Sequence, residues 1–222
     1  MTDLAIYDMD RTVTRHATYT PFLLHCAVRR APWRLLCLPA VALSMLAYAA
    51  RLIDRARLKE INHRLLLGGA THPRDLKPLV ESFADRQLAS NIRPGARRAI
   101  ARDKAEGRRV VLATASYRLY ADAIAERLGF DDVIGTGSVI GLDARVHARI
   151  AGENCYGPAK MRMIADWLGA GLEGKHGHVR FYSDHASDQP AFEWSDEPVA
   201  VNPHARLRRL AEQRGWAIED WG

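Results

Sequence analysis

Short apolar runs alternate with amphipathic stretches over most of this chain. Apolar runs typical of buried strands lie at residues 4–7, 110–113, 132–134, 138–140, 179–182 and 198–201, and a hairpin reaches residue 150. Apolar positions at helical spacing lie at 97–106, 120–128, 160–168 and 205–214, with a helical turn at 190–194. This alternation predicts an α/β fold with a doubly wound, Rossmann-like parallel sheet.

A helical region interrupts the alternation directly after the first run. Helical periodicity covers residues 18–30, 33–53, 54–67 and 73–89, with no strand pattern between them. The pattern predicts an all-helical cap inserted after the first strand, with boundaries near Thr14 and Arg93. The expected division is a core of residues 1–14 and 94–222 and a cap of residues 15–93.

Two carboxylates one residue apart end the first apolar run. Asp8 and Asp10 follow Leu4–Tyr7, and α/β sheets bind ligands at the carboxyl ends of their strands. Alternation along the strand sends both side chains to the same side, where one can attack a substrate and the other can move a proton. The alternative is a plain strand end followed by an Asp turn.

Three further elements carry polar side chains at strand or helix ends. Thr114 with Ala115 and Ser116 follows the run 110–113, Lys160 opens a helix, and Asp184 and Asp188 follow the run 179–182. A hydroxyl, an amine and two carboxylates suit a phosphate bound with a hard cation such as Mg²⁺. Each alone is more often an ordinary turn or surface residue, but their joint order predicts phosphoryl transfer.

These four motifs resemble those of the haloacid dehalogenase superfamily, within it the helical-cap phosphatases related to phosphoserine phosphatase. The resemblance covers almost the whole chain. It implies that Asp8 is the nucleophile that forms an aspartyl-phosphate, and that Asp10 protonates the leaving alcohol and then activates water. It further implies that Thr114 and Lys160 hold the phosphoryl oxygens.

The same resemblance implies Mg²⁺ as the cofactor. The metal would be bound by the Asp8 carboxylate, the main-chain carbonyl of Asp10 and Asp184. Asp188 would support either the metal shell or Lys160. His185, between the two metal-side acids, either contacts substrate or is an ordinary loop residue.

Two other patterns suggest ligands but have simpler explanations. Residues 169–176 nearly match the spacing of a phosphate-binding P-loop, yet the motif ends in His176 and precedes a strand instead of following one. His176 and His178 form a pair without a third neighbouring metal ligand. Both segments are expected to be loops.

The basic charge of the chain is concentrated in the cap. The formal net charge is +6, yet residues 15–93 alone carry 13 Lys and Arg against 5 Asp and Glu. Within that block, residues 35–50 are sixteen consecutive uncharged residues with arginines on both sides. Such a helix measures about 24 Å against a hydrocarbon core of about 30 Å. A single crossing would also separate Asp8 from the other three motifs, so the expected alternatives are a buried cap helix, an interfacial helix or a re-entrant turn at Pro39.

The surroundings of this helix bear on substrate and location. The pattern from Arg29 to Pro39 is similar to the bacterial phosphatidylglycerophosphatase C family, which implies a phosphorylated lipid such as phosphatidylglycerol phosphate. The alternatives are a soluble phosphatase for phosphoserine or another small ester, and a binding protein on an inactive phosphatase fold. Three cysteines without a C-x-x-C pair and no signal-peptide pattern lead us to expect a cytoplasmic protein, or one peripheral or monotopic on the inner face of the membrane. An anionic membrane surface is an expected partner, and nucleic acid is not.

Overall fold

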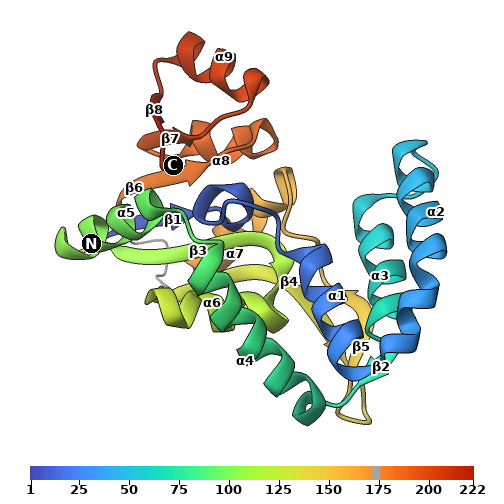
Figure 1. Ribbon diagram of the computed structural model, residues 1–222. Helices are drawn as coiled ribbons and strands as arrows, with labels where there is room; N and C mark the ends of the chain where they lie inside the picture. The colour runs from blue at the N-terminus through green and yellow to red at the C-terminus, as the bar shows by residue number, and fades with distance from the viewer. Residues whose placement is uncertain (172–175) are drawn as a thin grey trace.

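The computed structural model describes residues 1–171 and 176–222 and contains one mixed sheet in its described part (Figure 1). The strand order is β2-β5-β4-β3-β1-β6-β7-β8. The strands are β1 (Thr2–Tyr7), β2 (Ala70–Thr71), β3 (Arg109–Tyr117), β4 (Asp132–Ile140), β5 (Val146–Ala151), β6 (His176–Ser183), β7 (Glu197–Val201) and β8 (Ala217–Glu219). All neighbours from β4 to β8 pair in parallel, whereas β5 is antiparallel to β4 and β2. The prediction of a mostly parallel α/β sheet is confirmed.

Strand β1 lies at the centre of the sheet, between β3 and β6. Its residues Leu4–Tyr7 have no exposed surface, because both faces of a parallel sheet are covered by helices. The chain first builds β3 and β4 on one side of β1 and later β6 and β7 on the other. The carboxyl end of β1 is therefore a topological switch point, where α/β proteins place ligands.

Helices cover both faces of the sheet. On one face Ala5 and Tyr7 share a core with α5 (Pro94–Ala105) and α6 (Arg118–Leu128). On the other, Leu4 and Ile6 share a core with α7 (Pro158–Gly171), α8 (Gln189–Trp194) and α9 (Ala205–Arg214). The alternation of side chains along β1 thus links two cores, as a doubly wound fold requires.

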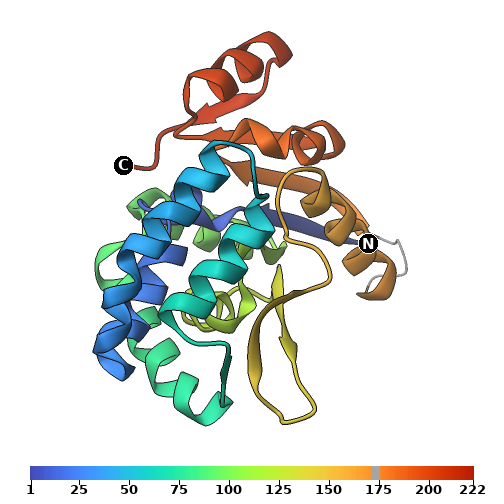
Figure 2. The same cartoon turned by 90° about the vertical axis from the view of Figure 1, so that its right-hand side faces the viewer.

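The inserted segment leaves the core after the turn at Met9–Val13. It contains α1 (Tyr19–Arg30), a 3-10 turn (Pro32–Cys37), α2 (Leu38–Ala49), α3 (Arg55–Leu66), β2 and α4 (Pro73–Ser90). Helices α2 and α3 lie side by side in both views (Figures 1 and 2), and α4 packs on α6. Thr14 and Ile92 form an antiparallel bridge where the segment leaves and rejoins the core. The division into two domains stays a prediction.

Several predicted elements differ from the structure. The insert is not all-helical, because Ala70 and Thr71 pair with the edge strand β5. The predicted helix 33–53 is a 3-10 turn followed by α2, whose first turn holds Pro39. Residues 132–134 and 138–140 belong to one strand, β4, whose second half pairs with β5. Strand β3 continues through Thr114 to Tyr117, and β8 was not predicted.

Candidate active site

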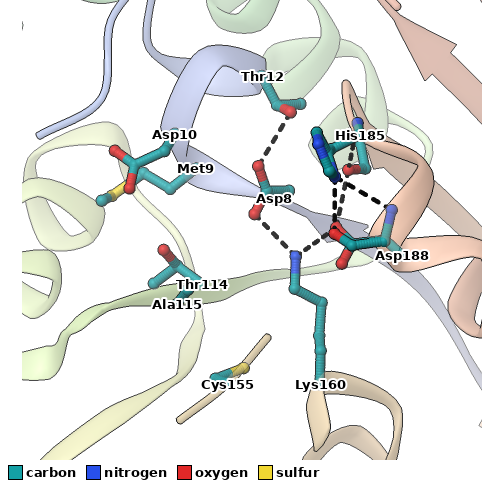
Figure 3. Close-up of polar contacts among 12 residues, drawn as sticks. Asp8, Met9, Asp10, Thr12, Thr114, Ala115, Cys155, Lys160, His185 and Asp188 are labelled. Carbon is teal, nitrogen blue, oxygen red and sulfur yellow. Dashed lines mark hydrogen bonds and ion pairs between the residues drawn. The ribbon is translucent and has the colours of Figure 1, made fainter. Parts of the chain in front are cut away.

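Asp8 is the first residue after the central strand β1. Its main-chain N–H donates to the carbonyl of Tyr182 at 2.9 Å, which continues the pairing of β1 with β6. The sheet therefore fixes the backbone at Asp8. Figure 3 shows its carboxylate between Thr12 on one side and Lys160 on the other.

Lys160 lies in the first turn of α7 and is almost completely buried. Its Nζ donates to Asp8 Oδ1 at 2.8 Å and to Asp188 Oδ2 at 2.6 Å (Figure 3). Asp188 Oδ2 also accepts from Ser183 Oγ at 2.8 Å. The lysine thus joins the ends of β1 and β6, and Ser183 orients its second carboxylate partner.

Asp184 approaches the same place from the end of β6. The Thr12 hydroxyl lies 3.1 Å from Asp8 Oδ2 and 3.3 Å from Asp184 Oδ1, and its oxygen accepts from the Asp184 N–H at 2.9 Å. A single threonine side chain therefore holds two carboxylates next to each other. The sequence did not single out Thr12 for this role.

Burial determines the charge balance of this cluster. Burial raises the pKa of Asp8 to about 7, against the lowering effect of Lys160 and with help from Asp188 and Asp184. Burial likewise raises the pKa of Asp184 to about 6. For Lys160, burial opposes the charge, but the two aspartates outweigh it and raise its pKa. The site holds more negative charge than one lysine balances.

The carboxylate oxygens of Asp8, Asp184 and Asp188 are the candidate ligands for a cation. Among the described residues, no three His, Cys, Asp or Glu side chains form a preformed metal cluster. Mg²⁺, however, takes only one or two carboxylates and completes its octahedron with water and phosphate oxygens. Asp8 and Asp184, bridged by Thr12, are donors of this kind, and Asp188 Oδ1 is buried without a hydrogen-bond partner. The donor set fits a hard cation; the Asp10 carbonyl as a ligand stays a prediction.

Asp10 turns away from the Asp8–Lys160 pair (Figure 3). Its Oδ1 accepts from the main-chain N–H and the hydroxyl of Thr18, each at 2.8 Å, and its Oδ2 accepts from Ser116 Oγ at 2.8 Å. Three donors fix a carboxylate that still lines the cavity. Asp10 thus contacts both the start of the insert and the end of β3.

Thr114 is fully buried at the end of β3. Its Oγ1 accepts from the Ser116 N–H at 3.0 Å, which leaves the hydroxyl proton free to donate. Its neighbour Ala115, rather than Thr114, lines the cavity. The role of Thr114 as a phosphate ligand stays a prediction.

A cavity of about 300 Å³ opens beside these groups. Its lining comes from both the core and the insert: Asp8, Asp10, Arg11, Ala17, Arg55, Ala115, Tyr156, Lys160, Asp184, His185, Ser187 and Asp188. Of the predicted site residues, only Thr114 is missing from this lining.

Sequence reasoning missed the cationic groups beside the cavity. Arg55, at the start of α3, stacks on Tyr156 at 4.1 Å from the ring centre. Lys59, one turn later, donates to the Ala115 carbonyl and to Asn154 Oδ1, the latter at 2.6 Å. Burial and the neighbouring Arg55 lower the pKa of Lys59 to about 7. The only sequence feature that included Arg55 and Lys59 was the basic block of residues 15–93, and it does not show which of its side chains face the core.

Three histidines, His176, His178 and His185, have different surroundings. His185 lines the cavity, and its Nδ1 accepts from the Ser187 N–H at 3.1 Å. Burial and the neighbouring His204 lower its pKa. His176 packs edge-on against Trp194, whereas His178 lies beside Arg108, so the two rings have separate partners. The prediction of a loop is wrong for both histidines, which lie in β6. The P-loop-like pattern 169–176 begins within α7 and ends at the first residue of β6, and its residues 172–175 lie outside the described part of the chain.

The family profile of haloacid dehalogenase-like hydrolases matches residues 5–193. The chain belongs to this family. It is 34% identical over 148 residues to phosphoserine phosphatase SerB1 of Mycobacterium tuberculosis, a match that covers 66% of this chain and 47% of the relative. This chain thus spans about half the length of that relative.

Two further similarities extend the comparison. A histidinol-phosphatase of Neisseria meningitidis is 26% identical over 147 residues, which is 65% of this chain and 66% of the relative. A crystal structure of a Bordetella pertussis protein with unknown function superimposes with a TM-score of 0.89 at 25% identity and covers 100% of both chains. The fold of that protein therefore matches this chain over its full length.

Proposed function

We propose that this protein is a Mg²⁺-dependent phosphomonoesterase that acts through an aspartyl-phosphate on Asp8. One observation carries the proposal: the Asp8 carboxylate, paired with buried Lys160 at the end of the central strand, faces a cavity of about 300 Å³. Family membership and the named phosphatases among the relatives support it.

The side chains divide the reaction between them. Asp8 attacks the phosphorus atom, the bond to the alcohol oxygen breaks, and Asp10 gives that oxygen a proton. Asp10 then takes a proton from the water that attacks the aspartyl-phosphate, which releases inorganic phosphate and restores Asp8. Lys160 and Thr114 hold the phosphoryl oxygens, and Asp188 holds Lys160.

The negative charge at the site explains the need for a metal ion. An attacking carboxylate and a phosphate dianion repel each other, and Lys160 alone already serves two aspartates. Mg²⁺ bound by Asp8, Asp184 and the Asp10 carbonyl would supply the missing positive charge.

The substrate we favour is a small soluble phosphate ester. The relatives are named for phosphoserine and histidinol phosphate, and a cavity of about 300 Å³ suits an ester of that size. This ranks the soluble alternative above the phosphatidylglycerol phosphate that the sequence pattern suggested. A lipid phosphate stays the second candidate because α2, within the insert, exposes apolar side chains.

A substrate panel tests the proposal. Hydrolysis of p-nitrophenyl phosphate should require Mg²⁺ and disappear in Asp8→Asn. Phosphoserine or histidinol phosphate should then show a higher kcat/KM than phosphatidylglycerol phosphate in mixed micelles. A preference for the lipid would reverse the ranking, and a folded protein without any Mg²⁺-dependent hydrolysis would favour the binding-protein alternative.

A further inference from the structure

Helix α2 and the preceding 3-10 turn form an apolar element on the outside of the insert (Figures 1 and 2). Residues Pro32–Ala49 have a mean hydropathy of 1.3, high enough for a membrane span, yet only 11% of them are buried. A core helix of such composition would be mostly buried. This element instead leaves most of its apolar surface uncovered.

Only one side of α2 packs against the protein. Val41 and Ser44 are buried, and Ser44 Oγ contacts Asn62 Oδ1 of α3 at 2.7 Å. The rest of α2, together with the 3-10 turn before it and the residues just after it, exposes large apolar side chains. Trp33, Leu36, Leu43, Met45, Leu46 and Leu52 are each between 51 and 82% exposed. We call these six residues the α2 face. Several large apolar side chains exposed over one short segment are typical of an interaction surface.

Arginines lie at both ends of the α2 face. Between Arg29 and Arg57 the chain has six arginines and a single acidic residue, Asp54. Arg55 faces the active-site cavity and Arg34 donates to main-chain carbonyls of α3. The other four arginines are exposed: Arg29, Arg30, Arg51 and Arg57. Arg51, two residues after the end of α2, has φ 61°, a conformation in which glycine is the usual residue. A cationic side chain therefore stands after α2 at a position where the backbone conformation favours glycine.

The α2 face and its neighbouring arginines together favour one class of partner over the others. Nucleic acid would gain nothing from an apolar centre. A second copy of this chain, packed face to face about a two-fold axis, would bring like-charged arginines together. An anionic bilayer matches both features, because its interior accepts apolar side chains and its headgroups attract arginine.

The fold also sets the orientation. Strand β1 precedes α2, β3 follows the insert, and the two strands pair directly, so a crossing of the membrane would pull the sheet apart. We propose that the α2 face docks this protein onto a membrane that contains anionic lipid, with the axis of α2 parallel to the membrane surface. The proposal is independent of the reaction at Asp8.

Vesicle sedimentation of the full chain tests the proposal. We expect binding to phosphatidylglycerol/phosphatidylcholine vesicles that weakens as salt rises, and little binding to phosphatidylcholine alone. The double substitution Leu43→Asp with Leu46→Asp should lower binding at least tenfold. Both leucines are 66% exposed, so the variant should fold. Leu142→Asp, at an exposed leucine between β4 and β5, is the matched control and should bind like the parent.

Arg51→Gly separates charge from folding. Glycine suits a φ of 61°, so the variant should keep its Tm, yet it should bind anionic vesicles about fivefold more weakly, the contribution of one arginine at such a surface. Hydrolysis of a soluble ester should be unchanged in all these variants. The proposal is overturned if anionic and neutral vesicles bind equally or not at all, or if the double Asp variant binds like the parent. A dimer that the double Asp variant abolishes, without vesicle binding, would assign the face to self-association instead.

Discussion

Replacing Lys160 by Met is the sharpest test of the electrostatics of the site. The side chain is 2% exposed and contacts Asp8 at 2.8 Å and Asp188 at 2.6 Å. A methionine side chain has most of the volume of the lysine side chain, so the substitution mainly removes the charge and its ion pairs. Removing one member of a buried ion pair costs about 3–5 kcal/mol of unfolding free energy. We expect a loss of that size at pH 8 without metal.

Urea denaturation monitored by circular dichroism measures this loss. Lys77→Met, at an exposed lysine of α4, is the control and should change the unfolding free energy by less than about 0.5 kcal/mol. Adding Asp188→Asn to Lys160→Met should recover part of the loss, because it removes an unbalanced carboxylate.

The loss should also depend on pH. Because the pKa of Asp8 is about 7 and that of Asp184 about 6, both carboxyls are largely neutral at pH 5, and the lysine then has less charge to balance. The substitution should cost clearly less at pH 5 than at pH 8. A loss below about 1 kcal/mol at pH 8, or one equal at both values, would refute this account of the site.

Three more predictions concern other parts of the molecule. Asp10→Asn should lower kcat of p-nitrophenyl phosphate hydrolysis by about 10²–10⁴-fold with little change in Tm, since the amide oxygen can still accept from Thr18; normal kcat would contradict the acid–base role. Asp103→Ala should lose about 3 kcal/mol in urea denaturation, because the buried carboxylate accepts from the hydroxyls of Tyr7 and Tyr182 and pairs with Arg180; a loss within error would contradict this. The folded-state pKa of Asp8 (about 7) exceeds the ordinary value, so this carboxyl binds more protons in the folded than in the unfolded chain between about pH 4 and pH 7. The amide of Asp8→Asn cannot titrate, so in EDTA the Tm of the parent relative to that of Asp8→Asn should fall from pH 5 to pH 8, and a relative Tm that rises over that range would contradict it.

The core of the fold could be predicted because its signals are local. Leu4–Tyr7 forms an apolar run bounded by charged residues, and a helix-closing glycine stands at Gly129 with φ 77°. β2 and β8 could not be predicted in this way. They are two and three residues long, and they form because a neighbouring strand offers unpaired hydrogen-bonding groups.

The residues of the candidate site also fall into two groups, those that local sequence signals predict and those that only tertiary packing brings together. Asp8, Lys160, Asp184 and Asp188 follow strands or open a helix, so the order of elements alone predicts that they meet. Arg55 lines the cavity, and Lys59 lies beside it on the Ala115 carbonyl, because α3 packs on the core. Nothing in the local sequence indicates that Lys59 is 5% exposed while Arg57, two residues earlier, points to solvent.

The packing of the apolar helix in the insert could not be predicted from the sequence. The sequence left residues 35–50 open between a buried helix, an interfacial helix and a re-entrant turn. The structure shows a helix that is packed on one side and exposed on the other. The periodicity is uninformative here because both sides of α2 are apolar, so the buried side cannot be told from the exposed side by composition.

Trapping the covalent intermediate tests the central claim most directly. The protein is mixed with p-nitrophenyl phosphate and Mg²⁺, quenched in acid within one turnover, digested at low pH and mapped by mass spectrometry. We predict one added phosphoryl group on the peptide that contains Asp8, more of it in Asp10→Asn when hydrolysis of the intermediate is slowed, and none in Asp8→Asn. Turnover without a phosphorylated peptide in any quench, or a phosphoryl group on another residue, would contradict the assignment of Asp8 as the nucleophile.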